Sequence, residues 1–171
     1  MLIERPVSDL GSCRREGGWL WLDLTAPSAE EIWETGSEFD FDRLSVEDVR
    51  DVTIFPKVDH HDDYLFVVLH GVITGEGARL RTAEVDMFIG ADFLVTMHMD
   101  PVAGVGRIAD QVTSSAELGA GNPALLAAAI AESGSRRYLP LLDALDERIE
   151  ELEDLAVAAE PATLSETQAL R

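Results

Sequence analysis

The segment that most constrains the fold is Tyr64–Val72, which is apolar at nearly every position. A strand with one face in water alternates apolar and polar residues, whereas a strand covered on both faces is apolar throughout. Tyr64–Val72 therefore predicts a strand in a sheet that has helices on both faces. Three further strands are predicted, at Trp19–Leu24, Arg79–Ile89 and Phe93–Met99. Short Gly-containing turns precede the last two, so this part of the sheet is predicted to be antiparallel.

A first helix is predicted after the Trp19–Leu24 strand. Ser28 and Glu31 have the spacing of a capping box, in which each residue accepts a hydrogen bond from the backbone of the other. The helix is predicted to continue to about Ser37, with Ile32 and Trp33 facing the core.

A second, short helix is predicted to start at a cap formed by Asp42 or Ser45 and to reach about Asp51. Pro56 prevents any helical continuation. Its apolar residues are predicted to face inward and its acidic residues outward: Leu44, Val46, Val49 and Val52 in the first group, and Glu47, Asp48 and Asp51 in the second.

The chain after Pro101 has a helical pattern. One helix is predicted over Val102–Leu118, a break at Gly119–Gly121, and a second helix that starts at Asn122 and continues to about Ala159. This helix is predicted to kink near Ser133-Gly134-Ser135 and Pro140, which are poor residues for a helix interior. A stripe at alternating steps of three and four predicts contact with another helix: Tyr138, Leu142, Leu145, Ile149, Leu152 and Ala156.

The predicted domains are a body over residues 1–100, a long acidic helical pair over 101–160, and a last segment over 161–171.

Net charge excludes whole classes of partner. The chain has 13 basic and 33 acidic residues, which gives −20. Nucleic acids and anionic membrane surfaces would be repelled. Such a surplus can serve solubility alone, but it also makes divalent cations the natural small partners.

No group of residues predicts catalysis. The sequence lacks a phosphate-binding loop, a nucleophile elbow and a zinc-protease motif, so we expect no enzyme. His60-His61-Asp62-Asp63 is interpreted as a solvated turn, and His70 and His98 as hydrogen-bonded histidines in or at the ends of strands.

Nothing in the sequence predicts a membrane span or export. The longest apolar run, Ala124–Ala131, is far shorter than the roughly 18 residues of a membrane helix, and the N-terminus lacks the pattern of a secretory signal. Cys13 is the only cysteine. It therefore has no disulfide partner in the chain, which suits a reducing cytosol, and it is interpreted as inert.

The order of several motifs is more specific than composition. The sequence combines an aromatic strand before a proline, an acidic helical turn, a Pro-Lys pair and two apolar strands in one order. This arrangement resembles the cytoplasmic domain of the CorA family of divalent-cation channels, from about Trp19 through the helix after Tyr138. The motifs are Trp21-Leu22-Asp23-Leu24, Leu44-Ser45-Val46-Glu47-Asp48-Val49, Pro56-Lys57-Val58, Asp63–Leu69 and Gly90 with Phe93–His98.

The resemblance implies a fold and an assembly. The expected fold is an α/β/α sandwich with a mixed, partly antiparallel sheet, followed by two long acidic helices. Residues 161–171 would begin a stalk helix, and two membrane helices would follow in segments absent here. The family forms homopentamers that conduct Mg²⁺, often with Co²⁺ or Ni²⁺. A related branch carries Zn²⁺, and a stand-alone acidic interaction module is a further alternative.

The resemblance also implies a regulatory site on the cytoplasmic side of the membrane. Asp48 would hold a regulatory Mg²⁺ between neighbouring subunits, with Glu47 near a second ion and Glu132 as a further ligand. Mg²⁺ would be a regulatory cofactor, with the other major ligand beyond Arg171. The sequence departs from the family pattern at Phe55, which replaces the usual Arg before Pro-Lys, and at Gly134 and Pro140 within the helix.

Overall fold

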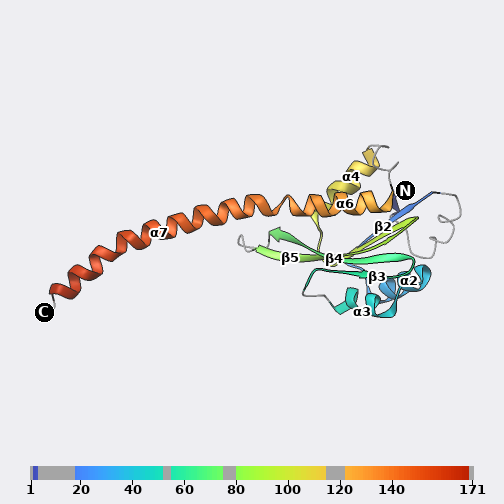
Figure 1. Ribbon diagram of the computed structural model, residues 1–171, viewed down its shortest axis with the longest axis horizontal. Helices are drawn as coiled ribbons and strands as arrows, with labels where there is room; N and C mark the ends of the chain where they lie inside the picture. The colour runs from blue at the N-terminus through green and yellow to red at the C-terminus, as the bar shows by residue number, and fades with distance from the viewer. Residues whose placement is uncertain (1, 4–17, 52–54, 75–79, 115–121, 170–171) are drawn as a thin grey trace. The chain divides into compact units, whose positions relative to one another are not determined.

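The computed structural model describes residues 2–3, 18–51, 55–74, 80–114 and 122–169 (Figure 1). The chain forms two compact units, Met1–Arg136 and Arg137–Arg171. The sequence predictions for Cys13, Val52, the turn before Arg79, the strand start at Arg79, the helix end at Leu118 and the break at 119–121 lie outside the described residues.

The first unit is built on a mixed sheet of six strands in the order β1-β2-β6-β5-β4-β3. The pairs β1·β2 and β2·β6 are parallel, and the pairs β6·β5, β5·β4 and β4·β3 are antiparallel. The predicted mixture of strand directions is confirmed. The strands are β1 (Leu2–Ile3), β2 (Leu20–Thr25), β3 (Lys57–His60), β4 (Tyr64–Thr74), β5 (Leu80–Gly90) and β6 (Phe93–His98).

The sequence did not predict strand β3. The sequence analysis assigns Lys57 to a Pro-Lys pair and His60 to a solvated turn, but these residues pair with β4, with Lys57 opposite Val68 and His60 opposite Leu65. The strand is short, charged and alternately exposed, as edge strands usually are. It therefore lacks the apolar run by which the other strands are recognised.

One face of the sheet is covered by helices α2 (Ala29–Phe39) and α3 (Arg43–Asp51). The predicted capping box is present, since Ser28 and Glu31 exchange hydrogen bonds at the start of α2. The core on this face is rich in aromatic residues. Its members include Ile32, Phe39, Phe41, Val46, Val49, Tyr64, Phe66, Val68, Phe88, Phe93, Val95 and Met97.

Two inward predictions for these helices are wrong. The buried residues of α2 are Ile32, Thr35, Gly36 and Phe39, which form one stripe at helical spacing. Trp33 falls outside this stripe and is 37% exposed. In α3 the buried stripe is Ser45, Val46 and Val49, and Leu44 is 68% exposed.

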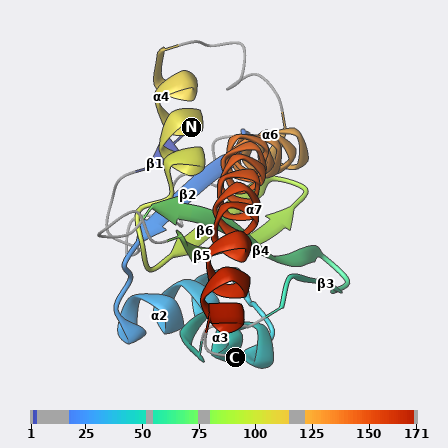
Figure 2. The same cartoon turned by 90° about the vertical axis from the view of Figure 1, so that its left-hand side faces the viewer.

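The opposite face is covered by helices α4 (Ala103–Ser114) and α6 (Pro123–Ser135), as Figure 2 shows. Their core includes Trp21, Val85, Met87, Leu94, Val105, Ile108, Leu126, Ala127 and Ile130. The two helices approach closely at Gly104, where an added Cβ atom would lie 3.4 Å from the Gly134 backbone nitrogen. Helices on both faces of a mixed sheet confirm the predicted α/β/α sandwich.

The second unit contains helix α7 (Tyr138–Ala169). The predicted break near Ser133-Gly134-Ser135 is confirmed, since α6 ends at Ser135 and α7 begins three residues later. Pro140 lies in the first turn of α7, where its missing N–H costs no helical hydrogen bond. Pro161, predicted to open a separate segment, lies within α7. Of the helices described after residue 100, only α7 is both long and acidic.

Candidate cation site on helix α3

Helix α3 places two acidic side chains at the surface of the first unit. The Asp42 carboxylate accepts hydrogen bonds from the backbone N–H of Leu44 and Ser45 at 2.9 and 3.4 Å, which favours Asp42 over Ser45 as the cap. The Tyr64 hydroxyl accepts a hydrogen bond from the Asp42 N–H and ties this turn to the sheet. Because the opposite stripe of α3 is buried, Glu47 and Asp48 lie on its partly exposed side.

Lys57 already neutralises Asp48. Its Nζ atom lies 2.5 Å from Asp48 Oδ2 and 2.6 Å from Asp59 Oδ2, and 5.1 Å from the centre of the Phe66 ring. Burial lowers the pKa of Lys57, but the hydrogen bonds to Asp48 and Asp59 outweigh it and raise the pKa overall. The side chains of Lys57 and Asp48 remain 29% and 39% exposed. A cation that binds Asp48 Oδ2 therefore competes with the lysine for that oxygen.

The other two predicted ligands have partners of their own. Glu47 pairs with Arg43 at 2.9 Å, and Glu132 pairs with Arg136 at 2.7 Å. Glu132 lies on α6, whereas Glu47 and Asp48 lie on α3, and the sheet separates these helices (Figure 2). Within one chain, Glu47 and Asp48 therefore lie together, and Glu132 lies apart from them. Among the described residues, no three His, Cys, Asp or Glu side chains are placed to hold a metal ion.

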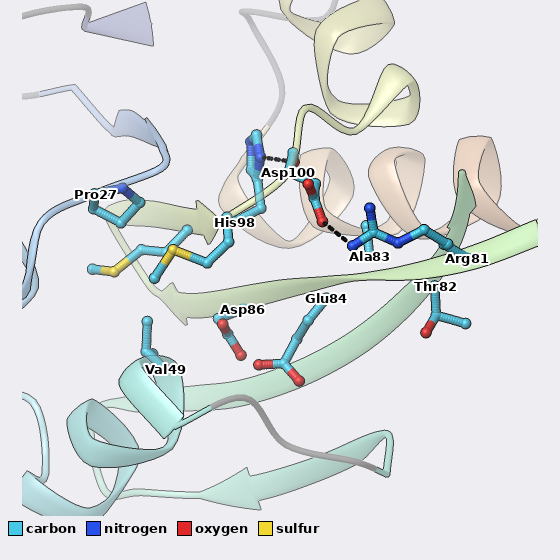
Figure 3. Close-up of a pocket in the computed structure, with 11 residues that line it drawn as sticks. Pro27, Val49, Arg81, Thr82, Ala83, Glu84, Asp86, His98 and Asp100 are labelled. Atoms are coloured by element: carbon cyan, nitrogen blue, oxygen red, sulfur yellow. Dashed lines mark hydrogen bonds and ion pairs between the residues drawn. The ribbon is translucent and has the colours of Figure 1, made fainter. Parts of the chain in front are cut away.

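A second acidic pair, which the sequence analysis missed, lies on the sheet below the C-terminal end of α3. Asp86 and Glu84 project from β5 toward α3 and line a cavity of about 220 Å³ together with Val49 (Figure 3). Burial, followed by the charge and hydrogen bonding of Glu84, raises the pKa of Asp86 to about 8. The available signal was two acids two residues apart in a strand, on the side where Phe88 is buried.

His98 is a hydrogen-bonded histidine at the end of a strand, as predicted, and His70 lies beside Glu84 within a strand. His70 lies opposite Glu84 in the β4·β5 ladder, with Nε2 3.4 Å from Glu84 Oε2. His98 lies on the other face, with Nε2 3.3 Å from Asp23 Oδ1 and Nδ1 2.8 Å from the Asp100 carbonyl oxygen. Burial lowers the pKa of His98, but hydrogen bonding and charge from Asp23 raise it overall.

The predicted solvated turn is confirmed in part. Asp62 and Asp63 are exposed in the turn between β3 and β4. His61 is half-buried instead, because its ring stacks on Tyr64 at 4.5 Å and its Nε2 atom lies 3.1 Å from Ser45 Oγ. His61 therefore helps to hold the turn against α3.

Comparison with solved structures defines the class of fold. The chain resembles the soluble domain of CorA from Methanocaldococcus jannaschii with a TM-score of 0.63 and 22% identity, over 81% of this chain and 55% of that one. It resembles the ZntB cytoplasmic domain from Vibrio parahaemolyticus with a TM-score of 0.66 and 17% identity, over 77% and 53%. The fold is that of the soluble domains of these two proteins.

Sequence comparison identifies the family. A family model described as CorA-like Mg²⁺ transporter protein matches residues 16–171, so the chain belongs to the CorA family. The putative metal ion transporter YfjQ of Bacillus subtilis is 29% identical over 136 residues, which cover 80% of this chain. The chain spans 42% of the length of that relative. In the part of the chain that the structure describes, no helix is long and apolar enough to cross a membrane.

Proposed function

We propose that this chain is the cytoplasmic, cation-sensing domain of a CorA-like divalent-cation channel or transporter. Membership of the family supports the general role, and the acidic surface of α3 supports the sensing role. Segments absent from this sequence would cross the membrane, and the intact protein would assemble as a homopentamer.

The observation that carries the proposal is the separation of the predicted ligands. Glu47 and Asp48 lie on one face of the sandwich and Glu132 lies on the other. A site that uses both groups needs two copies of the chain, one presenting α3 and its neighbour presenting α6. This requirement fits a cation bound between neighbouring subunits of a ring.

Mg²⁺ suits such a site. It keeps several of its waters and takes only one or two carboxylates from a protein. The Asp48 side chain is 39% exposed and is therefore accessible to such an ion. Lys57 occupies the position of the ion when the ion is absent. Asp48, Glu47 and Glu132 are the proposed ligands.

The proposed mechanism is electrostatic. Each chain carries −20, and carboxylates that face each other between subunits repel by about 1–4 kcal/mol per close pair. Bound Mg²⁺ bridges them and favours the closed ring. When Mg²⁺ is scarce, repulsion loosens the ring, because the ion binds the closed state more tightly than the open one.

The test is a thermal melt of the full-length protein in MgCl₂ and in NaCl of equal ionic strength. Mg²⁺ should raise the melting temperature more than NaCl does, and Asp48→Asn should remove much of that excess. Asp51→Asn is the matched control, since Asp51 is an exposed acid on the same helix and pairs with Arg50. Equal responses to the two salts would exclude the sensing role.

The zinc-transporting branch is the second candidate. Its support is the TM-score to the ZntB cytoplasmic domain, 0.66, beside 0.63 for the CorA soluble domain. Flux of Zn²⁺, Co²⁺ and Mg²⁺ into liposomes that contain the intact protein separates the two branches. Faster zinc than magnesium flux would favour the zinc branch.

A stand-alone interaction module is the third candidate. Helix α7 carries an exposed apolar stripe, in which Leu142, Leu145, Ile149 and Leu152 are each about half exposed. The gene beyond Arg171 separates this candidate from the others. Two apolar segments there would favour the channel, and a stop codon would favour the module.

A further inference from the structure

One row of side chains crosses the sheet below α3 and connects Lys57 with Asp86. Lys57 lies opposite Val68 in the β3·β4 ladder, and Val68 lies opposite Asp86 in the β4·β5 ladder. Residues directly opposite each other in an antiparallel pair project from the same face of the sheet. The Lys57 and Asp86 side chains therefore project from one face, two strands apart, and the fully buried Val68 lies between them.

Lys57 lies within electrostatic range of three carboxyl groups. Its Nζ atom contacts Asp48 on α3 and Asp59 on β3, and lies over the ring of Phe66. The third carboxyl group is that of Asp86, whose ionisation the charges of Lys57 and Asp48 affect in opposite directions. The lysine therefore has one acidic neighbour toward the core in addition to the two that it contacts.

Asp86 offers an acceptor that is not in use. It is 3% exposed, and its Oδ1 atom has no hydrogen-bond partner among the described residues. A hydrogen bond to a buried oxygen is stronger than one at the surface, because the local dielectric constant is low. Asp86 and Glu84 also line the cavity of about 220 Å³, with both carboxyl groups on the side of β5 that faces α3 (Figure 3). Side chains next to this cavity have room to turn.

The distance between the two side chains permits a direct contact. Opposite Cβ atoms on neighbouring strands lie about 5 Å apart, so about 10 Å separates the Cβ atoms of Lys57 and Asp86. An extended lysine side chain, an aspartate side chain and the hydrogen bond between them together span this distance. Lys57 can therefore exchange one acceptor for the other without movement of β3.

We infer that Lys57 moves from Asp48 to Asp86 when a cation binds to Asp48, which makes Asp86 a positioning residue for the cation site. This inference rests on the proposed sensing function. A divalent ion at Asp48 takes the oxygen that the lysine contacts and repels its ammonium group. Asp59 alone is a weak alternative, because its side chain is 45% exposed. Asp86 is buried, so its hydrogen bond to the displaced lysine favours the ion-bound form.

The exchange makes the effect of Asp86 depend on Lys57. Without the Asp86 carboxyl group, the displaced lysine has no buried acceptor, and the cation binds less tightly. Without the lysine, no acceptor is needed, and a substitution of Asp86 no longer changes cation binding. A general loss of stability would not depend on Lys57 in this way, so a double-mutant cycle distinguishes the two explanations.

The first test is the position of Lys57 in a crystal structure of the 171-residue chain with Asp48→Ala. This substitution removes the contacted carboxylate without any metal ion. The Lys57 Nζ atom should lie within about 3.2 Å of an Asp86 carboxyl oxygen. Asp51→Ala is the matched control, since Asp51 pairs with Arg50 on the same helix, and it should leave Lys57 in contact with Asp48. A lysine that stays at Asp59 in Asp48→Ala would overturn the inference.

The second test is the Mg²⁺ concentration that gives half of the thermal stabilisation of the full-length protein. Asp86→Asn should raise this midpoint about fivefold, and should leave it unchanged in a Lys57→Met background. The exposed-turn variant Asp63→Asn should have no effect in either background. An equal rise with and without Lys57 would overturn the inference, as would no rise in the parent background. If Asp86→Asn does not fold, the first test decides.

Failure of this inference differs from failure of the sensing role. If Mg²⁺ stabilises the full-length parent protein no more than NaCl does, the sensing role fails and the inference fails with it. If Mg²⁺ does stabilise the parent and Asp48→Asn removes the effect, the sensing role stands. An effect of Asp86→Asn that does not depend on Lys57 would then overturn the inference alone.

Discussion

The two faces of the sheet treat buried charge in different ways. On the face below α4 and α6, the Asp23 carboxylate accepts a hydrogen bond from Thr96 Oγ1 at 2.5 Å and lies 3.3 Å from His98 Nε2. Thr96 in turn accepts a hydrogen bond from the Trp21 indole at 3.0 Å. This carboxylate is thus satisfied by neighbours from its own sheet. Strands β2 and β6 supply all four residues.

On the face below α3, carboxylates outnumber cations. Asp48 and Asp59 share one lysine, and the buried pair of Asp86 and Glu84 has the imidazole of His70 beside it. One face therefore uses polar groups to fix the fold, whereas the other holds carboxylates whose charge an added cation or proton can neutralise. The proposed ligands Glu47 and Asp48 lie on this second face.

Substitutions in the apolar part of the α3 face should destabilise the protein most. Phe88 is fully buried, and its ring lies 3.9 Å from Phe41 and 4.6 Å from Phe66, centre to centre. Phe88→Ala should lower the free energy of unfolding by about 3–5 kcal/mol. Chemical denaturation measures this loss.

Leu94→Ala is the counterpart on the α4/α6 face, where Leu94 is fully buried. It should cost about 2–5 kcal/mol. Losses of similar size would show that the faces differ in their polar groups and not in their packing. A loss below about 1 kcal/mol for Phe88→Ala would contradict the packing of its ring against Phe41 and Phe66.

The next effect is the pH dependence of Asp86. Its folded pKa, about 8, lies above its ordinary value, so the folded chain holds a proton that the unfolded chain releases. This contribution to stability is complete below about pH 4 and is lost as the pH rises toward 8. Asp86→Asn should therefore gain stability relative to the parent chain across this window, by at most about 1.4 kcal/mol per pH unit.

Urea unfolding of both proteins at pH 5, 6, 7 and 8 measures the difference. Asp63→Asn, in an exposed turn, is the control and should show little change. A constant difference between the parent chain and Asp86→Asn at every pH would show that Asp86 is ionised throughout, which would remove the contrast between the faces.

The sequence carries much of the fold because the main signals are local. The apolar run of β4 predicted a strand covered on both faces, and the spacing of Ser28 and Glu31 predicted the start of α2. Edge strand β3 has no such signal, because it is short, partly charged and alternately exposed, and it forms by pairing with β4. The burial of Ile32 but not Trp33 depends on the angle at which α2 meets the sheet, which local pattern does not give.

The same difference between local and long-range signals applies to the residues of the candidate sites. The exposure of Glu47 and Asp48 could be predicted from the two sides of one helix. The contact of Lys57 with Asp48 could not, since it requires α3 to lie over β3. The alternation of apolar and polar residues in β5 would fit a strand with one face in water equally well, so it does not predict that Asp86 and Glu84 are buried. Asp86 and Glu84 become buried only because α3 covers that face, which is a long-range contact.

A smaller effect is expected for the satisfied carboxylate. Asp23→Asn should cost about 1.5–3 kcal/mol, because it removes charged hydrogen bonds to His98 and Thr96. The pKa of His98 is raised in the folded state, so its contribution is complete below about pH 6.5 and is lost as the pH rises through the folded value. The loss in Asp23→Asn should therefore be larger at pH 6 than at pH 9.

Chemical denaturation at the two pH values measures this, and NMR titration of His98 should show a lower pKa in the variant. The stabilities of the two variants, relative to the parent chain, should depend on pH for opposite reasons. Asp23→Asn loses a favourable charge pair, whereas Asp86→Asn loses an unfavourable charge. Equal losses at pH 6 and pH 9 would contradict the Asp23–His98 interaction.

The smallest effect on stability is expected for Lys57→Met. The pair of Lys57 and Asp48 is partly exposed, and such pairs contribute about 1 kcal/mol or less. Removal of the lysine also frees Asp48 from its internal competitor. The Mg²⁺ concentration that gives half of the thermal stabilisation of the full-length protein should then fall by up to about fivefold, the equivalent of about 1 kcal/mol.

Arg50→Met is the matched control, since Arg50 pairs with Asp51 on the same helix and does not contact Asp48. It should leave the Mg²⁺ midpoint unchanged. If Lys57→Met raises the midpoint instead, the lysine organises the site for the ion and does not compete with it. In that case Lys57 would be a permanent part of the cation site. Only with the lysine in place would Asp48 and Asp59 be held close enough together to bind a cation.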